Sequence, residues 1–116
     1  MRHEVMLTEN AYFDLDEIHE YFARHDQPAN ADNVLDSMKW VIDNLSSFPE
    51  RGSYLKELLE LGIREYRQIF FKPYRVIYKI LGSVVYIMII ADGRRDMDGL
   101  LTRRLLGQPY SIQAKA

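Results

Sequence analysis

The chain has 116 residues, 47% of them hydrophobic, which suffices for one core and excludes two domains of ordinary size. Cysteine is absent, so disulfides and thiolate metal sites are excluded, and we expect a cytoplasmic protein. The net charge of −2 conceals an asymmetry, since residues 1–62 have five Lys/Arg against thirteen Asp/Glu, whereas residues 63–116 have ten against four. The excess of basic residues in the second half predicts a surface that binds an anionic partner. In the alternative interpretation, the asymmetry arises only because the helices contain the acidic residues and the strands contain the basic ones.

The acidic half predicts a strand followed by two amphipathic helices. Residues 2–7 alternate in polarity, and Thr8 can cap a helix that extends to about His25 with apolar residues every three or four positions. Pro28 suits the first turn of a second helix, which we expect to end before Pro49. Because the connector is short, the two helices should form an antiparallel hairpin whose apolar side needs a sheet to cover.

The basic half predicts three strands and a last helix. The strands are expected at residues 63–71, 74–81 and 84–91, joined by a turn at Lys72-Pro73 and a tight connector at Gly82-Ser83. The third strand is almost wholly apolar, so we expect it at the centre of the sheet, buried on both faces. A short helix over residues 97–106 would be capped by Asp96 or Asp98. Residues 50–62 predict only a turn and either a short helical turn or irregular chain.

These elements make a single domain over residues 1–107, and residues 108–116, which have no periodic pattern, are expected to be a flexible tail. The longest apolar run has the length of a strand, and the N-terminal residues pass directly into charged sequence, so no membrane span or secretion signal is expected. The three histidines lack the spacing of metal ligands, so neither a metal nor a cofactor is expected.

Basic and aromatic residues gather on the predicted strands and at the corner after the last of them. The candidate partner-binding or phosphate-binding residues are Arg64, Arg67, Lys72, Tyr74, Arg75, Arg94, Arg95, Arg103 and Arg104. RNA cleavage would also need groups that move protons on both sides of the phosphate. In a nuclease Arg75 and Arg95 would stabilise the phosphate, and Tyr66 or Tyr74 would have to transfer protons despite an ordinary pKa near 10. In the alternative interpretation, these residues satisfy sheet edges and pair with acidic segments of a partner.

Two motifs carry a resemblance to a known superfamily. The sequence PYRVIYKI, the Gly-Ser connector, the apolar strand and the sequence DGRRDM follow one another in residues 73–97. Together they resemble the ParE/RelE superfamily of type II toxin–antitoxin toxins, and the resemblance extends over residues 1–106. It implies an α+β fold in which an N-terminal strand and an antiparallel two-helix hairpin pack on a largely antiparallel four-stranded sheet, with a short C-terminal helix.

The resemblance also implies a small bacterial toxin that arrests growth and forms a hetero-oligomer with its antitoxin. The antitoxin would be ParD-like or another small DNA-binding protein whose C-terminal segment wraps the toxin. RelE-like members cut messenger RNA in the ribosome with basic residues on the sheet and usually a C-terminal tyrosine. ParE-like members lack much of that set and poison DNA gyrase.

Carried over residue by residue, the phosphate-binding arginine of RelE-like toxins falls on Arg75, and the arginine after the last strand falls on Arg95. Their two strand lysines fall on Tyr66 and Gln68, and their C-terminal tyrosine falls on Leu101. The resemblance therefore favours a ParE-like gyrase poison that is not itself an enzyme. The alternative is a RelE-like ribosome-dependent mRNA endonuclease.

Overall fold

The fold is built on a five-stranded sheet with the strand order β1-β5-β4-β3-β2. The computed structural model describes residues 2–106, so the predicted tail and the predicted domain end at residue 107 lie outside the described residues. In chain order the elements are β1 (Glu4–Leu7), α1 (Glu9–His25), α2 (Pro28–Asp43), a 3₁₀ turn (Asn44–Ser46), β2 (Ser53–Tyr54), α3 (Lys56–Leu59), β3 (Tyr66–Phe71), β4 (Tyr74–Leu81), β5 (Val84–Asp92), and α4 (Met97–Leu101), which continues as a π-helical turn (Thr102–Leu106). The predicted α+β fold is confirmed, with one more strand than expected.

The extra strand is β2, which pairs with β3 through only two residues. A segment this short has no alternation that a sequence pattern can reveal. The prediction of β5 as the central strand was wrong, because β1 pairs with it in parallel on its outer side and β4 occupies the middle of the sheet. The prediction that β5 is buried on both faces is confirmed for residues 87–91.

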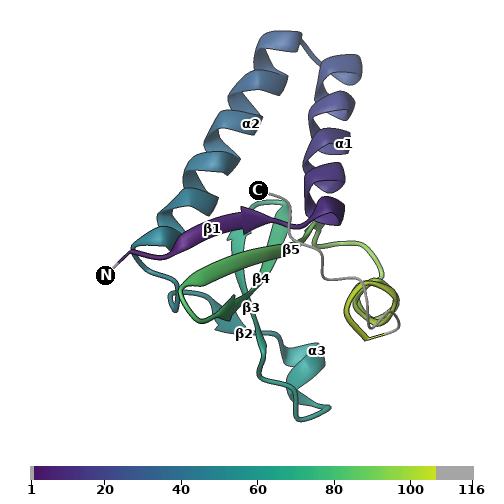
Figure 1. Ribbon diagram of the computed structural model, residues 1–116. Coiled ribbons are helices and arrows are strands. Elements are labelled where there is room, and N and C mark those ends of the chain that lie inside the picture. Colours follow the sequence, from purple (N-terminus) through teal and green to yellow (C-terminus); the bar gives the residue numbers. More distant parts are fainter. Residues whose placement is uncertain (1, 107–116) are drawn as a thin grey trace.

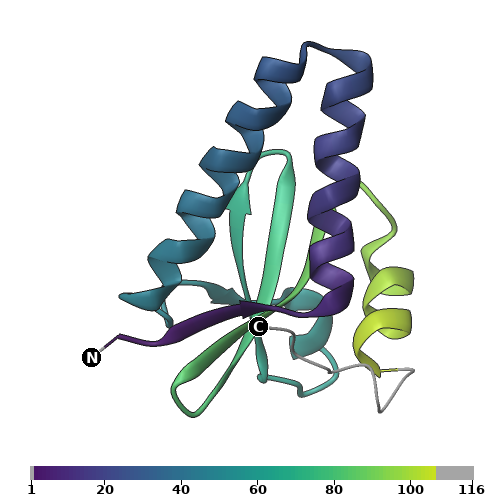
Figure 2. The same ribbon diagram turned by 45° about the horizontal axis from the view of Figure 1, so that its top comes forward.

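The two long helices form the predicted hairpin and lie on one face of the sheet (Figure 1). Thr8 caps α1 as expected, since its hydroxyl accepts a hydrogen bond from Ala11 N at 3.2 Å, and the same hydroxyl donates to Ile87 O on β5. This residue therefore fixes the start of the helix against the sheet. Figure 2 shows that the helices diverge from their connecting turn toward the sheet, and that β1 crosses between their separated ends.

The sheet has an apolar cluster on each face. On the hairpin face, Leu15 and Ile42 of the helices pack against Val76, Tyr78 and Ile87 of the strands. On the opposite face, α3 and α4 cover the sheet with a second cluster of buried residues, which are Leu55, Leu58, Tyr66, Ile77, Met88, Ile89, Ala91, Met97, Leu100 and Leu101. None of the helices in residues 2–106 is long and apolar enough to cross a membrane.

The turns follow the predicted chemistry. Gly82 has a φ of +59°, a conformation that glycine adopts without strain, and so closes the hairpin between β4 and β5. Asp96 is the cap of α4, since its carboxylate accepts a hydrogen bond from Gly99 N at 3.2 Å. β3 begins at Tyr66, three residues later than predicted, because residues 63–65 are irregular.

Candidate functional site

Arg75 lies on β4 and is held by two side chains on the face opposite the helical hairpin. Its guanidinium donates to both carboxylate oxygens of Glu57 on α3, at 2.9 and 3.1 Å, and its Nε donates to Gln68 Oε1 on β3 at 2.7 Å. Only 9% of Arg75 is exposed. The hydrogen bonds from Arg75 lower the pKa of Glu57 below its ordinary value, so this carboxylate is ionised at neutral pH.

The turn after β5 closes over the stem of Arg75. Gly93 N donates to Pro73 O at 2.9 Å, which holds this turn against the connection between β3 and β4. A Cβ atom on Gly93 would lie 3.4 Å from both Cγ and Cδ of Arg75, so a glycine allows the turn to approach closely. Arg75, Gln68 and Gly93 line part of a cleft of about 420 Å³. The turn thus confines Arg75 to its contacts with Glu57 and Gln68.

The two candidate tyrosines lie on opposite faces of the sheet. Tyr66 is buried in the cluster beneath α3 and α4. Burial, followed by the nearby charge of Glu65, raises the pKa of Tyr66 above 10.0. Tyr74 packs against the cluster under the hairpin. Burial and the charge of Asp92 raise the pKa of Tyr74 as well, so both phenols keep their protons at neutral pH.

Arg94 and Arg95 form an exposed corner after β5. Arg94 donates to both oxygens of the Asp92 carboxylate, at 2.9 and 2.6 Å, and its backbone N–H donates to the same group. These hydrogen bonds lower the pKa of Asp92 to about 2. Within residues 2–106 the side chain of Arg95 has no hydrogen bond or ion pair, so it remains available to a partner. Both arginines line a cleft of about 460 Å³ beside Tyr21 and Tyr74.

The Arg104 side chain is only 17% exposed and binds to groups of its own chain. Its guanidinium donates to both oxygens of Asp14 on α1, at 3.1 and 2.9 Å, and to Met88 O on β5 at 2.8 Å. Asp14 in turn accepts a hydrogen bond from Ile90 N at 3.0 Å. Because β1 pairs with β5 only as far as Ile87, these side chains satisfy backbone groups on the part of the β5 edge that β1 leaves open.

The remaining candidates lie near the other ends of the strands and on the last helix. Arg67 donates to Glu50 O and Gly52 O and to Tyr54 Oη, and its guanidinium carbon lies 4.5 Å from the centre of the Tyr54 ring. The exposed candidates are Arg64, Lys72 and Arg103. The set predicted from the sequence therefore divides into arginines with internal partners and cations that face solvent, and it does not form one cluster.

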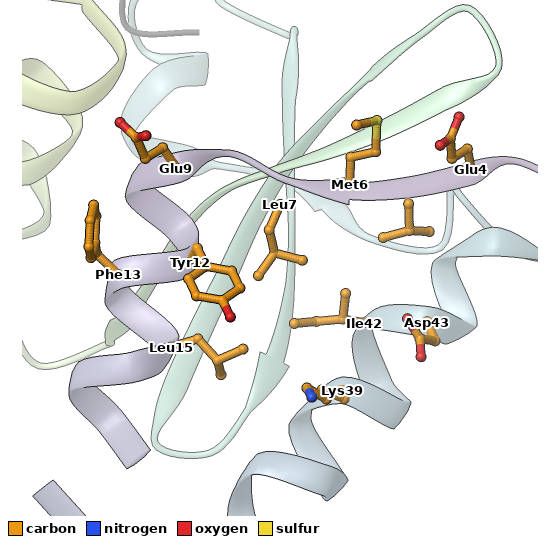
Figure 3. A pocket seen from close by; sticks show the side chains of 11 residues that line it. Glu4, Met6, Leu7, Glu9, Tyr12, Phe13, Leu15, Lys39, Ile42 and Asp43 are labelled. Atoms are coloured by element: carbon orange, nitrogen blue, oxygen red, sulfur yellow. The ribbon is translucent and has the colours of Figure 1, made fainter. Parts of the chain in front are cut away.

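A cleft larger than the two beside Arg75 and Arg94 lies elsewhere, at the open end of the helical hairpin, and sequence reasoning missed it. This hairpin cleft has a volume of about 840 Å³ and is lined by Glu4, Val5, Met6, Leu7, Glu9, Tyr12, Phe13, Leu15, Lys39, Ile42 and Asp43. Figure 3 shows Leu7, Leu15 and Ile42 pointing toward one another, with the Tyr12 ring beside them and Lys39 on the facing helix. Its edge strand, β1, has a neighbouring strand on one side only.

The sequence contained one signal for this cleft. Tyr12 and Phe13 lie off the buried stripe of α1, and both are more than half exposed. Large exposed aromatics on a helix that already has a buried face indicate a surface for a partner. Among the described residues, no three His, Cys, Asp or Glu side chains are placed to hold a metal ion.

One family model matches most of the chain, and several solved structures share its fold. The family model described as the ParE toxin of the type II toxin–antitoxin system parDE matches residues 5–97. A protein in the chromosomal ParDE toxin–antitoxin system from P. aeruginosa has a similar structure, with a TM-score of 0.66 and 16% identity over 78% of this chain and 96% of that one.

Two further structures share the fold. A chain of the toxin–antitoxin complex RelBE2 from Mycobacterium tuberculosis has a TM-score of 0.55 and 21% identity over 79% of this chain and 99% of that one. A mutant of the E. coli toxin RelE in the free state has a TM-score of 0.61 and 15% identity over 91% of this chain and 100% of that one. No curated protein sequence matches the chain.

Proposed function

The chain belongs to the ParE toxin family of type II toxin–antitoxin systems, and we propose that it arrests bacterial growth by poisoning DNA gyrase. In this proposal it acts by binding rather than by catalysis, and a cognate antitoxin holds it inactive in a hetero-oligomer. It acts in the cytoplasm, where gyrase and the antitoxin are found. The residue that carries the proposal is Arg75.

Arg75 is occupied by groups of its own chain. In a nuclease of the RelE type this arginine would bind the phosphate of the RNA. Here both of its terminal nitrogens donate to Glu57 and its Nε donates to Gln68. A phosphate would have to displace an ionised carboxylate from a bidentate, largely buried pair, which is among the stronger interactions of its kind. This arrangement supports a binding protein over an RNA-cleaving enzyme.

The positions that hold proton-transfer groups in RelE-like toxins also do not support RNA cleavage in this chain. The two positions of the RelE strand lysines hold Tyr66, which is buried with a raised pKa, and Gln68, which does not titrate. The position of the C-terminal tyrosine holds Leu101, which packs in the same buried cluster. A base and an acid are both needed to move protons during RNA cleavage. These three residues supply neither at neutral pH.

A supercoiling assay with purified gyrase and purified toxin tests the proposal directly. We expect inhibition of supercoiling and accumulation of the cleaved DNA–gyrase complex as toxin is added. The exposed cations Arg64, Lys72, Arg94, Arg95 and Arg103 are our candidates for the contacts with gyrase. Full supercoiling and no cleaved complex at excess toxin would reject gyrase as the target.

The antitoxin is proposed to occupy the hairpin cleft. The exposed rings of Tyr12 and Phe13 line the cleft together with apolar side chains of the core, and β1 offers a free strand edge beside it. Tyr12→Ala should then keep its toxicity but escape neutralisation by co-expressed antitoxin. Phe48→Ala is the matched control, because Phe48 is as exposed as Tyr12 but does not line the cleft. Equal neutralisation of both variants would place the antitoxin elsewhere.

A ribosome-dependent mRNA endonuclease is the second candidate. The observation in its favour is the free side chain of Arg95, which follows β5 at the turn that covers Arg75. This function predicts cuts in ribosome-bound transcripts that vanish in Arg75→Ala. Intact transcripts in cells whose growth is fully arrested would rule it out.

A further inference from the structure

We propose that Lys79 anchors a second interaction site, which binds a carboxylate on an acidic and partly apolar segment of the antitoxin. The inference deepens the proposed function and rests on it for the identity of the partner. Lys79 lies on β4 directly opposite Tyr66 of β3 and Tyr86 of β5. The lysine side chain therefore runs between two tyrosines on the sheet face opposite the helical hairpin.

Lys79 is buried without a carboxylate or any other acceptor. Only 9% of the residue is exposed, and its Nζ lies 5.5 Å from the centre of the Tyr66 ring. Apart from this ring contact, the side chain has no hydrogen bond or ion pair to the part of the chain that the structure describes. Lysine is rarely buried to this extent unless its charge is paired.

The ammonium group nevertheless reaches the surface. In residues 2–106 the one fully enclosed side-chain nitrogen or oxygen that lacks a partner is Nδ1 of His3, so the Lys79 Nζ atom is accessible to solvent. Its aliphatic stem is buried and its three N–H donors are all unused. Water can hydrate these donors in the free protein, and a carboxylate of a ligand can take the place of that water.

Lys79 helps to line a small cleft at the ends of β3 and β4. This edge cleft has a volume of about 200 Å³, and its walls include Tyr54, Arg64, Glu65, Arg67 and Leu81. The Arg67 guanidinium is already committed to two backbone carbonyls and the Tyr54 hydroxyl. Arg64, in contrast, is exposed and has no partner in the described chain. Lys79 and Arg64 are therefore two cations without internal partners, whereas Glu65 is the one acidic residue that lines the edge cleft. This excess of positive charge favours an anionic ligand.

The walls favour a peptide carboxylate over a nucleic-acid phosphate. Phosphate recognition relies on several free guanidinium forks or on clustered backbone N–H groups, and the edge cleft has one free fork, that of Arg64, because Arg67 is occupied by its own chain. Leu81 lies on the wall of the edge cleft and is half exposed. An apolar side chain of the ligand can therefore pack against Leu81 while a neighbouring carboxylate binds Lys79. A protein segment that alternates acidic and apolar residues combines both features.

The test is binding of a short capped peptide of glutamate and leucine to the purified chain, followed by NMR titration. The same peptide with glutamine in place of glutamate, inorganic phosphate and a single-stranded RNA oligonucleotide are the comparison ligands. Lys79→Gln should weaken binding of the acidic peptide about 10-fold, the effect of losing one charge-assisted contact. Arg24→Gln removes one positive charge from an exposed position on α1, outside the clefts described above, and should leave binding unchanged.

Stability distinguishes a binding role from a structural one. Lys79→Met keeps the buried stem and removes a charge that has no internal partner, so it should melt at the wild-type temperature or above it and still lose the peptide. A lower melting temperature would show that the ammonium group stabilises the fold, and would overturn the inference. Wild-type affinity in Lys79→Gln, equal binding of the glutamine peptide, or tighter binding of phosphate or RNA would overturn it as well.

Failure of this inference can be separated from failure of the proposed function. Peptide binding is measured on the purified chain without gyrase, whereas growth arrest is measured in cells that express the chain without antitoxin. Growth arrest with no binding of the acidic peptide would reject the edge cleft alone. Binding without growth arrest would reject the toxin mechanism and leave the acidic ligand in place.

Discussion

Replacing Glu57 with glutamine tests whether the Arg75 pair is as tightly held as the geometry indicates. The side chains of Arg75 and Glu57 are only 10% and 14% exposed, and the carboxylate accepts two of the three hydrogen bonds of the guanidinium group. Breaking a buried pair by removing one charge costs about 3–5 kcal/mol. Gln68 keeps its contact and the new amide can accept one bond, so we expect the lower end, about 3 kcal/mol.

A loss of this size is easy to measure. For a domain of about 100 residues, 1 kcal/mol lowers the melting temperature by roughly 4 °C, so Glu57→Gln should melt about 12 °C below the wild type. Circular dichroism during thermal and urea unfolding gives both values. Glu60→Gln is the control, because Glu60 follows the same helix and is exposed.

The double replacement Glu57→Leu with Arg75→Met should recover most of the lost stability, because neither charge then remains buried alone. If Glu57→Gln unfolds at the same midpoint as Glu60→Gln, the pair is not holding Arg75. A phosphate could then displace Glu57 from this arginine.

Three further predictions concern charges elsewhere in the fold and the pH dependence of this pair. The pKa of Glu57 is lowered from 4.5, so the stability difference between wild type and Glu57→Gln should be complete above about pH 5. The difference should shrink as the pH falls through the folded-state pKa of Glu57, and urea unfolding at a series of pH values measures it. Asp14→Ala removes the acceptor of Ile90 N, so hydrogen exchange at this amide should accelerate about 10-fold or more. Unchanged exchange would show that groups other than Asp14 protect this amide on the β5 edge. Arg94→Ala should raise the Asp92 pKa from about 2 toward its ordinary range in an NMR titration and change the melting temperature little, since the Arg94 side chain is exposed.

Local signals predicted the elements of this fold well. The Thr8 cap, the proline at the start of α2, the glycine between β4 and β5 and the Asp96 cap all depend on residues within a few positions of one another. The order of the strands depends on pairing across the chain. For this reason β4 rather than β5 proved central, and the two-residue β2 was missed.

The candidate site was harder to predict, because its decisive contacts are long-range. Arg75 was recognised from its strand, but its partner Glu57 lies 18 positions earlier, in a segment with no regular pattern. Arg104 belonged to the candidate set because it is basic, and its pairing with Asp14 spans 90 positions. Nothing in the sequence distinguishes Lys79 from the other residues of its strand. Only the structure shows that it is buried without an acceptor.

The pattern of paired and unpaired charges distinguishes residues that support the fold from residues that remain available for binding. Arg67, Arg75 and Arg104 each have several acceptors within the chain, so removing them should disturb the fold before it disturbs any partner. Lys79 and Arg95 have no such acceptors among residues 2–106, and the stem of Lys79 is buried so that its ammonium group is held at the wall of the edge cleft. A charged group that is held in place without an internal partner is available to a ligand. By this criterion the binding chemistry of the basic half lies at the unpaired cations rather than at the arginine that most resembles a catalytic residue.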